Sequence, residues 1–176
     1  MTRWVEPGAE FGELFATFRQ SAWRWESQGT YREPYESVAL ARFLRGEELD
    51  TSYLQGWLDD VRAATRAGRR FERVRLLTEP LTDYLRFELA VTLANVAAGE
   101  DIRVLPPDAG ALLGLPDHDF WIFDDREVAT LKFGPDGLLG AEIDDDPATL
   151  ARHRQWRDLA WSEAIPFETY WASAHL

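Results

Sequence analysis

Hydrophobic positions recur with helical spacing in three stretches of the first 68 residues. The apolar side chains repeat every three to four positions over residues 9–20, from Pro34 to Gly46, and from Asp50 or Thr51 to Gly68. This spacing is typical of amphipathic helices, and a proline in the first turn and a glycine just past the end mark their bounds. Between the first two, residues 22–26 alternate and predict a short strand. The N-terminal part is therefore predicted to be a mainly helical layer.

From residue 69 onward, short apolar or alternating runs are separated by turn residues and two long helical patterns. Strands are predicted over residues 71–77, 102–105, 120–123, 128–133 and 138–143. Helices are predicted over residues 83–98 and 109–113 and from Asp146-Pro147 onward, and Pro166 begins a terminal turn. The expected fold is α/β (α+β): a mixed sheet of about five strands with an N-terminal helical layer and a C-terminal helix. Residues 1–176 would form one domain, with 1–68 as the layer and 69–176 containing the sheet.

Composition limits the classes of function. The chain of 176 residues has no cysteine and a formal charge of −12, and Lys132 is its one lysine. Disulfides and thiolate chemistry are excluded, and a phosphate backbone would be repelled overall. The first residues lack a signal-peptide pattern and no apolar run is long enough for a membrane span, so we expect a cytoplasmic protein without membrane contact. No cofactor-binding motif is present, and no cofactor is expected.

The strand–helix–strand pattern after residue 70 predicts parallel strands joined by right-handed crossovers. Ligands of such sheets bind outside the carboxyl ends of the strands. Those ends are predicted at Thr78-Glu79, Leu105-Pro106 and Asp124-Asp125. Asp124 and Asp125, with Asp119 and Trp121 from the strand before them, are therefore candidate binding residues.

The stretch DHDFWIFDDREV, residues 117–128, admits two interpretations. In one, Trp121 and Phe123 fill one face of a strand, Phe120 and Ile122 fill the other, and the carboxylates are solvated at the turn. In the other, the stretch resembles the His-x-Lys-x4-Asp motif of the phospholipase D superfamily.

That resemblance places His118 and Asp125 at the histidine and aspartate, but Phe120 stands where the lysine would bind phosphate oxygens. Phenylalanine has no donor or charge, so a non-catalytic relative of one half of that fold is expected rather than an enzyme. The alternative is a phosphodiesterase-like hydrolase that uses Asp119, Asp124 or Asp125 with His118.

Charged residues on the helix predicted over 83–98 need partners. Arg86 and Glu88 are two positions apart and cannot face each other across a helical turn. One interpretation is a structural network of arginines and carboxylates. The other is a pocket lined by Tyr84 and Arg86 that accepts an anionic or planar ligand. Arg75, Tyr84, Arg86 and Glu88 are candidate binding residues in either case.

Arginines recur from Arg62 to Arg75, which makes a nucleic-acid-binding face an alternative function. The net charge and the lack of a recognition-helix pattern make nucleic acid an unlikely partner. A metal site is not expected: Asp144-Asp145-Asp146 precedes a helix and is explained by capping, and the histidines at 118, 153 and 175 lack ligand spacing.

Four segments resemble an actinobacterial family known only as a domain of unknown function. They are FGELFATFRQSAWRWESQGTY, TDYLRFELAVTLANVAAGEDIRVLP, DFWIFDDREVATLKFGPDG and RHRQWRDLAWSEAIPF. Members of that family are often encoded beside helix-turn-helix regulators. The resemblance implies a regulatory or accessory protein that binds a partner protein, such as a helix-turn-helix transcriptional regulator, or a small ligand. The sequence leaves open whether the protein forms a homo-oligomer.

Overall fold

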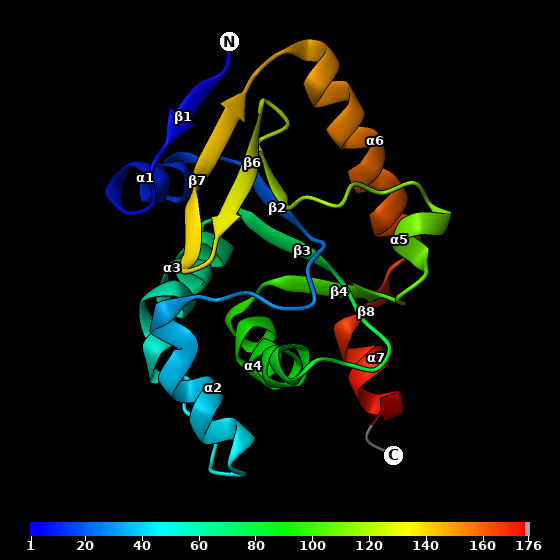
Figure 1. Cartoon of the computed structure of the whole chain (residues 1–176). Coiled ribbons are helices and arrows are strands. Elements are labelled where there is room, and N and C mark those ends of the chain that lie inside the picture. Colours follow the sequence, from blue (N-terminus) through cyan, green and yellow to red (C-terminus); the bar gives the residue numbers. More distant parts are fainter. Residues whose placement is uncertain (175–176) are drawn as a thin grey trace.

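One mixed sheet forms the centre of the molecule (Figure 1). The structure is a computed structural model that describes residues 1–174. Its sheet has eight strands in the order β1-β7-β6-β5-β2-β3-β4-β8. The strands are β1 (Arg3–Val5), β2 (Ser21–Glu26), β3 (Arg70–Leu76), β4 (Asp101–Leu105), β5 (Phe120–Phe123), β6 (Glu127–Gly134), β7 (Gly137–Asp144) and β8 (Ile165–Pro166). The expected α/β class is confirmed, with more strands than the five expected.

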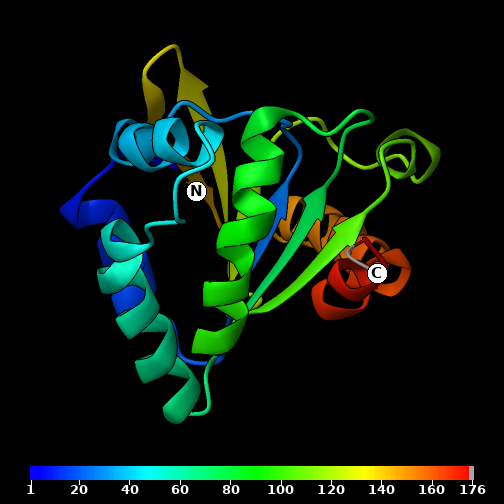
Figure 2. The same cartoon turned by 90° about the horizontal axis from the view of Figure 1, so that it is seen from below.

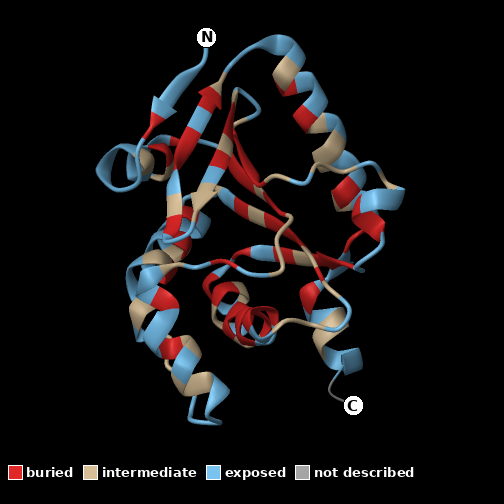
Figure 3. Ribbon diagram, in the orientation of Figure 1, coloured by how far each residue is buried: buried red, intermediate tan, exposed pale blue. Residues whose placement is uncertain are grey.

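Helices cover both faces of the sheet. They are α1 (Ala9–Thr17), α2 (Ser37–Leu44), α3 (Gln55–Arg66), α4 (Asp83–Ala98), α5 (Ala109–Leu112), α6 (Pro147–Glu163) and α7 (Phe167–Ala174), with 3-10 turns at Pro34–Glu36 and Ser52–Leu54. Figure 2 shows α2, α3 and α4 on one side of the sheet and α6 on the other. Figure 3 shows that α4 is buried on most of its sides, as its all-round apolar sequence predicts. None of the helices in residues 1–174 combines the length and the apolar composition that a membrane span needs.

Side chains alternate between the two faces of each central strand. On β5, Trp121 and Phe123 pack into the cluster under α1 and α3, whereas Phe120 and Ile122 pack toward α5 and α6. This confirms the division of the strand that was expected from its sequence. The core therefore lies in two layers, one on each face of the sheet.

The N-terminal part contributes more than a helical layer. Its strand β2 lies in the middle of the sheet, parallel to β3 and antiparallel to β5. Trp23 and Trp25 are buried on one face of β2, which gives a short strand enough apolar surface for a central place. β1 and β8 also join the sheet, at its two edges. They have three and two residues, too few for a recognisable alternation.

The starts of α4 and α6 follow the expected capping, whereas the cap expected from Asp50 or Thr51 does not form at α3, which begins after Leu54 without a side-chain cap. The Asp146 carboxylate accepts hydrogen bonds from the backbone N–H groups of Ala148 and Thr149 at 2.9 and 3.0 Å, directly before Pro147. α4 begins at the capping residue Thr82 and ends at Gly99, whose φ of 115° favours glycine. The capping explanation of Asp146 is therefore confirmed.

Candidate functional site

Charged side chains gather on the face of the sheet that looks toward α4. β2 and β3 are parallel neighbours, with Arg24 beside Arg73 and Glu26 beside Arg75 in register. Alternate residues of a strand point to the same face, so all four side chains project from one face. Together with carboxylates from α4 and two loops they form what we call the charge network. Its members are Arg24, Glu26, Arg73, Arg75, Glu88, Glu100 and Asp119.

Glu26 is the centre of the charge network. Its carboxylate oxygens lie 2.7 Å from Arg73 Nη1 and 2.6 Å from Arg75 Nε. Arg24 Nε lies 3.2 Å away. Burial alone would raise the pKa of Glu26, but the three guanidinium groups outweigh it and hold this pKa far below its ordinary value. Glu26 is therefore ionised at neutral pH.

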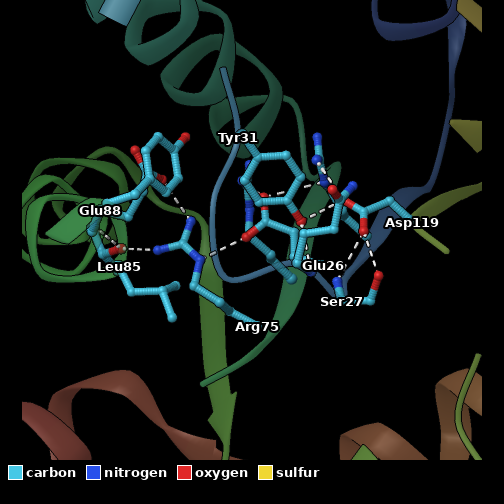
Figure 4. Close-up of polar contacts among 12 residues, drawn as sticks. Glu26, Ser27, Tyr31, Arg75, Leu85, Glu88 and Asp119 are labelled. Atoms are coloured by element: carbon cyan, nitrogen blue, oxygen red, sulfur yellow. Dashed lines mark hydrogen bonds and ion pairs between the residues drawn. The ribbon is translucent and has the colours of Figure 1, made fainter. Parts of the chain in front are cut away.

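Each arginine of the charge network contacts two carboxylates. Arg75 also donates to Glu88 at 2.8 Å, and Figure 4 shows it reaching toward Glu88 on one side and Glu26 on the other. Arg73 Nε donates to Glu100 at 2.8 Å. Buried guanidinium groups are strongly disfavoured without such partners, so these contacts hold the side chains in one arrangement.

Asp119 connects the charge network to the loop after β2. It accepts hydrogen bonds from the Ser27 backbone and side chain, at 2.9 and 2.8 Å, and from Tyr31 Oη at 2.6 Å. Arg24 Nη2 donates at 3.1 Å. Asp119 is 1% exposed, so the expectation that this carboxylate is solvated at a turn is wrong. It points toward the charge network because it lies on the same face of its strand as Trp121.

A cavity of about 620 Å³ opens beside the charge network. Its walls come from α1, β2, the loop before α2, α3, β3, α4 and the strands β5 to β7. Its lining residues include Phe15, Arg24, Glu26, Tyr31, Glu33, Tyr35, Glu36, Tyr53, Trp57, Arg73, Tyr84, Glu88, Val91, Asn95, Trp121 and Leu138. The walls therefore combine many aromatic rings with an unusual number of charged groups.

Several polar atoms of the walls are left without a partner. Tyr53 Oη, Asn95 Oδ1 and Trp121 Nε1 are buried and make no hydrogen bond to any residue within 1–174. A buried polar group of this kind is disfavoured by about 1–3 kcal/mol relative to a hydrogen-bonded one. The walls therefore contain polar groups whose hydrogen bonding the packing leaves incomplete.

Glu36 lies in the cavity wall and differs from the carboxylates of the charge network. Tyr84 Oη donates a hydrogen bond to it at 2.7 Å. Burial raises the pKa of Glu36 to about 7, the nearby charge of Glu88 adds to the shift, and the hydrogen bond from Tyr84 opposes it. Burial likewise raises the pKa of Glu88, against the effect of Arg75. Two carboxyl groups of this wall, Glu36 and Glu88, therefore have raised pKa values.

Five of the eight candidate residues lie in or beside the cavity. Tyr84, Glu88 and Trp121 line it, and Arg75 and Asp119 belong to the charge network behind it. The expectation that Arg86 lines a pocket together with Tyr84 is wrong. The Arg86 guanidinium is exposed and paired with Asp83 on the outside of α4, because positions two apart on a helix point in different directions.

Asp124 and Asp125 also lie away from the cavity. β5 runs antiparallel to β2, so its carboxyl end lies at the opposite edge of the sheet from Thr78-Glu79, and the expected single row of strand ends is wrong. Asp124 accepts the backbone N–H groups of residues 19, 20 and 21 at 2.7, 2.6 and 3.0 Å. Asp125 pairs with Arg154 and Arg157 on α6. Both carboxylates join elements of the fold.

His118 is separated from the aspartates that were grouped with it. His118 precedes β5, whereas Asp125 follows this strand. The His118 ring packs near His153 and Trp156, on the side of the sheet that α6 covers. Asp119 points to the other face of the sheet. His153 and His118 are closer than their sequence spacing indicates, with ring centroids 6.0 Å apart, and His175 lies outside the described residues.

The arginine run from 62 to 75 is divided between surface and interior. Arg73 and Arg75 are buried in the charge network. Arg62 pairs with Asp59, and Arg69 lies over the Phe18 ring. The run therefore does not present all its charges on one face.

The sequence reasoning missed Arg24, Glu26, Glu36 and Tyr31. The first two stand in the strand AWRWE, where charges alternate with tryptophans. A strand with large apolar residues on one face and charged residues on the other normally has a solvated face. The strand's place in the middle of the sheet, with helices on both sides, turns that pattern into a buried ion network.

Comparison with protein families identifies the group to which the chain belongs. A family model described as a domain of unknown function (DUF6879) matches residues 9–172. The chain belongs to this family. The match extends from α1 into α7 and so includes almost all of the cavity wall. A comparison with curated proteins found no match. The expected membership of a family of unknown function is confirmed, and its other implications stay predictions.

The central place of Glu26 gives a first prediction. Glu26→Gln would remove the anion shared by three arginines and leave each buried guanidinium group with one carboxylate instead of two. Breaking a buried ion network in this way typically costs about 3–5 kcal/mol. We expect urea unfolding at pH 7 to show a loss of that size, and a loss under 1 kcal/mol would contradict the role given to Glu26.

Glu36→Gln should act in the opposite direction. A raised pKa means that the folded state binds a proton more tightly than the unfolded state between pH 4.5 and 7, so the stability of the parent protein falls as pH rises through this window. The neutral amide removes that loss. We expect the variant to be more stable than the parent by about 1–3 kcal/mol at pH 8 and no more stable at pH 4. Glu48→Gln, at an exposed loop position, is the control. A Glu36→Gln variant that is less stable at pH 8 would be the contrary result.

Proposed function

We propose that this protein is a non-catalytic, cytoplasmic regulatory protein whose cavity binds a small ligand. The observation that carries this proposal is the cavity of about 620 Å³ beside the charge network. Small-molecule sites typically measure roughly 300–1,000 Å³ and combine apolar walls with a few polar groups that fix orientation. The aromatic walls, with Arg24, Glu33 and Glu36 among them, match that description.

The charge network supports binding by holding the walls in place. Arg24 and Arg73 lie in the wall, each fixed by two carboxylates. Tyr31 and Tyr84 are fixed by hydrogen bonds to Asp119 and Glu36. A wall that is already ordered loses little entropy when a ligand arrives.

The contacts of the acidic residues favour binding over hydrolysis. A hydrolytic site needs a base and an acid that converge on one reacting atom. His118 and Asp119 point to opposite faces of the sheet, and Asp119 is committed to Arg24, Ser27 and Tyr31. Asp124 and Asp125 are held by backbone N–H groups and by arginines. The same reasoning favours a ligand over nucleic acid, since two arginines of the basic run are buried.

We further propose that a partner protein responds to the ligand, and that the partner is a helix-turn-helix transcriptional regulator. The nature of this partner rests on the sequence resemblance. A route from the cavity to the surface is provided by the loop before α2: Tyr35 lines the cavity and is 61% exposed, and Val38 on α2 is 70% exposed. A ligand that contacts Tyr35 would alter this surface.

Filling the cavity tests the ligand-binding proposal. Leu138 and Leu139 are neighbours on β7, but Leu138 lines the cavity whereas Leu139 is 55% exposed. A library of small fragments of mixed charge would be screened by ligand-observed NMR against the parent protein, Leu138→Trp and Leu139→Trp. We expect fragments that bind the parent and Leu139→Trp and lose at least tenfold in affinity for Leu138→Trp. The proposal fails if no fragment binds, or if both variants bind alike.

Capture experiments test the proposed partner. The tagged protein would be incubated with an extract of the source cells, and proteins retained by the parent and by Val38→Asp would be compared. We expect a helix-turn-helix protein to be retained by the parent and to be lost from Val38→Asp. If the retained proteins include no such regulator, the transcriptional part of the proposal is wrong.

A further inference from the structure

The ionic groups around the cavity are unequal in number. Three arginines and five carboxylates are grouped together there: Arg24, Arg73 and Arg75 with Glu26, Glu36, Glu88, Glu100 and Asp119. Every one of these arginines already contacts two carboxylates. An anionic ligand would have to displace one of those carboxylates to reach a guanidinium, whereas a cation would meet the surplus of negative charge.

The surplus lies at one part of the wall. Glu36 is 7% exposed, and it forms no ion pair with any residue of the described chain. Its contact is the neutral hydroxyl of Tyr84. Glu33, three residues earlier, is half-buried in the same wall and accepts the backbone N–H of Leu138 at 3.1 Å. Within residues 1–174, Glu33 and Glu36 are therefore neighbouring carboxylates of this wall that no ion pair neutralises.

Oxygen acceptors predominate among the polar side chains of the same wall. The side chains of Glu33, Glu36 and Glu88 carry carboxylate oxygens, and Tyr35 and Tyr53 carry hydroxyl oxygens that can also accept. An ammonium or amidinium group carries several N–H donors and no acceptor, and it complements this set of atoms.

Aromatic rings complete the cavity on its other walls. Tyr35 and Tyr53 lie with ring centroids 6.2 Å apart, and Phe15 meets Trp57 edge to face at 5.6 Å. All four rings line the cavity. The faces of such rings attract cations, and their bodies bury apolar surface.

We propose that the ligand is an organic cation: a protonated amine or amidine on an aromatic or similarly flat apolar body. The charged head would lie at Glu36 and Glu33, and the apolar body would lie against Trp57 and the neighbouring rings. This inference rests on the proposed ligand-binding function and adds the charge class of the ligand. It replaces the anionic ligand that was one expectation from the sequence.

The raised pKa of Glu36 adds a coupling to protons. Near pH 7 part of the Glu36 carboxyl is protonated, because burial and Glu88 raise its pKa to about 7. A bound cation stabilises the carboxylate and so favours release of that proton. Cation binding should therefore tighten as pH rises from 6 to 8.

Probes that share one apolar body and carry a cationic, neutral or anionic head group test the inference. The first set is tryptamine, tryptophol and indole-3-propionate, which share an indole-ethyl body and are cationic, neutral and anionic at pH 8. The second set is phenethylamine, 2-phenylethanol and 3-phenylpropionate. Calorimetric titration of the intact chain at pH 8 should give at least one amine with a dissociation constant at least tenfold below that of its alcohol, and no tighter binding by either acid.

Variants locate the charged head. Glu36→Gln should weaken the better amine at least tenfold and leave the matching alcohol within about twofold. Glu48→Gln should change neither. Since Glu36→Gln is expected to be more stable than the parent at pH 8, a failure to fold would itself contradict the charge imbalance.

The possible failures are distinct. The cationic assignment is overturned if neither amine binds, if an alcohol or acid binds as tightly as its amine, or if Glu36→Gln leaves amine affinity unchanged. Binding of an acid or alcohol that Leu138→Trp abolishes would leave the ligand-binding function standing without its charge class. An empty fragment screen would remove the function itself.

Discussion

Burying more acids than bases in one place constrains the whole face of the sheet toward α4. Ionised groups lose several kcal/mol of hydration when they are buried, and ion pairs recover it only with good geometry. Glu26 has that geometry, with three guanidinium groups around one carboxylate. Burial raises the pKa values of Glu36 and Glu88, because less positive charge opposes it there than at Glu26. On this face the charge of Glu26 is therefore compensated by arginines, whereas Glu36 and Glu88 receive less positive charge.

The cavity follows from this arrangement. On this face the apolar core is split into two clusters, one with Phe71 and Trp121 and the other with Phe87 and Val91. The charged side chains of β2 and β3 lie between them, where apolar packing would otherwise close the space. The cavity borders both clusters, since Trp121 and Val91 are in its wall. Charged side chains therefore take the place of apolar packing here. They order the charge network, and they leave the open volume beside it.

Local patterns predicted much of the fold, and pairing between distant segments explains what they missed. The limits of α4 and the two faces of β5 could be predicted because capping, glycine and alternation act within a few residues. The central place of β2 could not, because strand order depends on contacts between segments some fifty to a hundred residues apart. The same holds for the site. Tyr84 and Glu88 were recognised from their helix, but Arg24 and Glu26 have a role only beside β3, and Asp119 only beside the loop after β2.

The central claim is that acids around the cavity ionise very unevenly, and carbon-13 NMR of the glutamate side-chain carboxyls tests it most directly. Across a titration from pH 3 to 9, the account predicts one carboxyl resonance with a midpoint near pH 7 that disappears in Glu36→Gln. It also predicts that Glu26 stays ionised to the acid end of the range. If all buried glutamates titrate together near their ordinary value of about 4.3, the acids around the cavity do not ionise unevenly, and burial does not hold a proton on Glu36. Cation binding would then not tighten between pH 6 and 8, because Glu36 would have no proton to release.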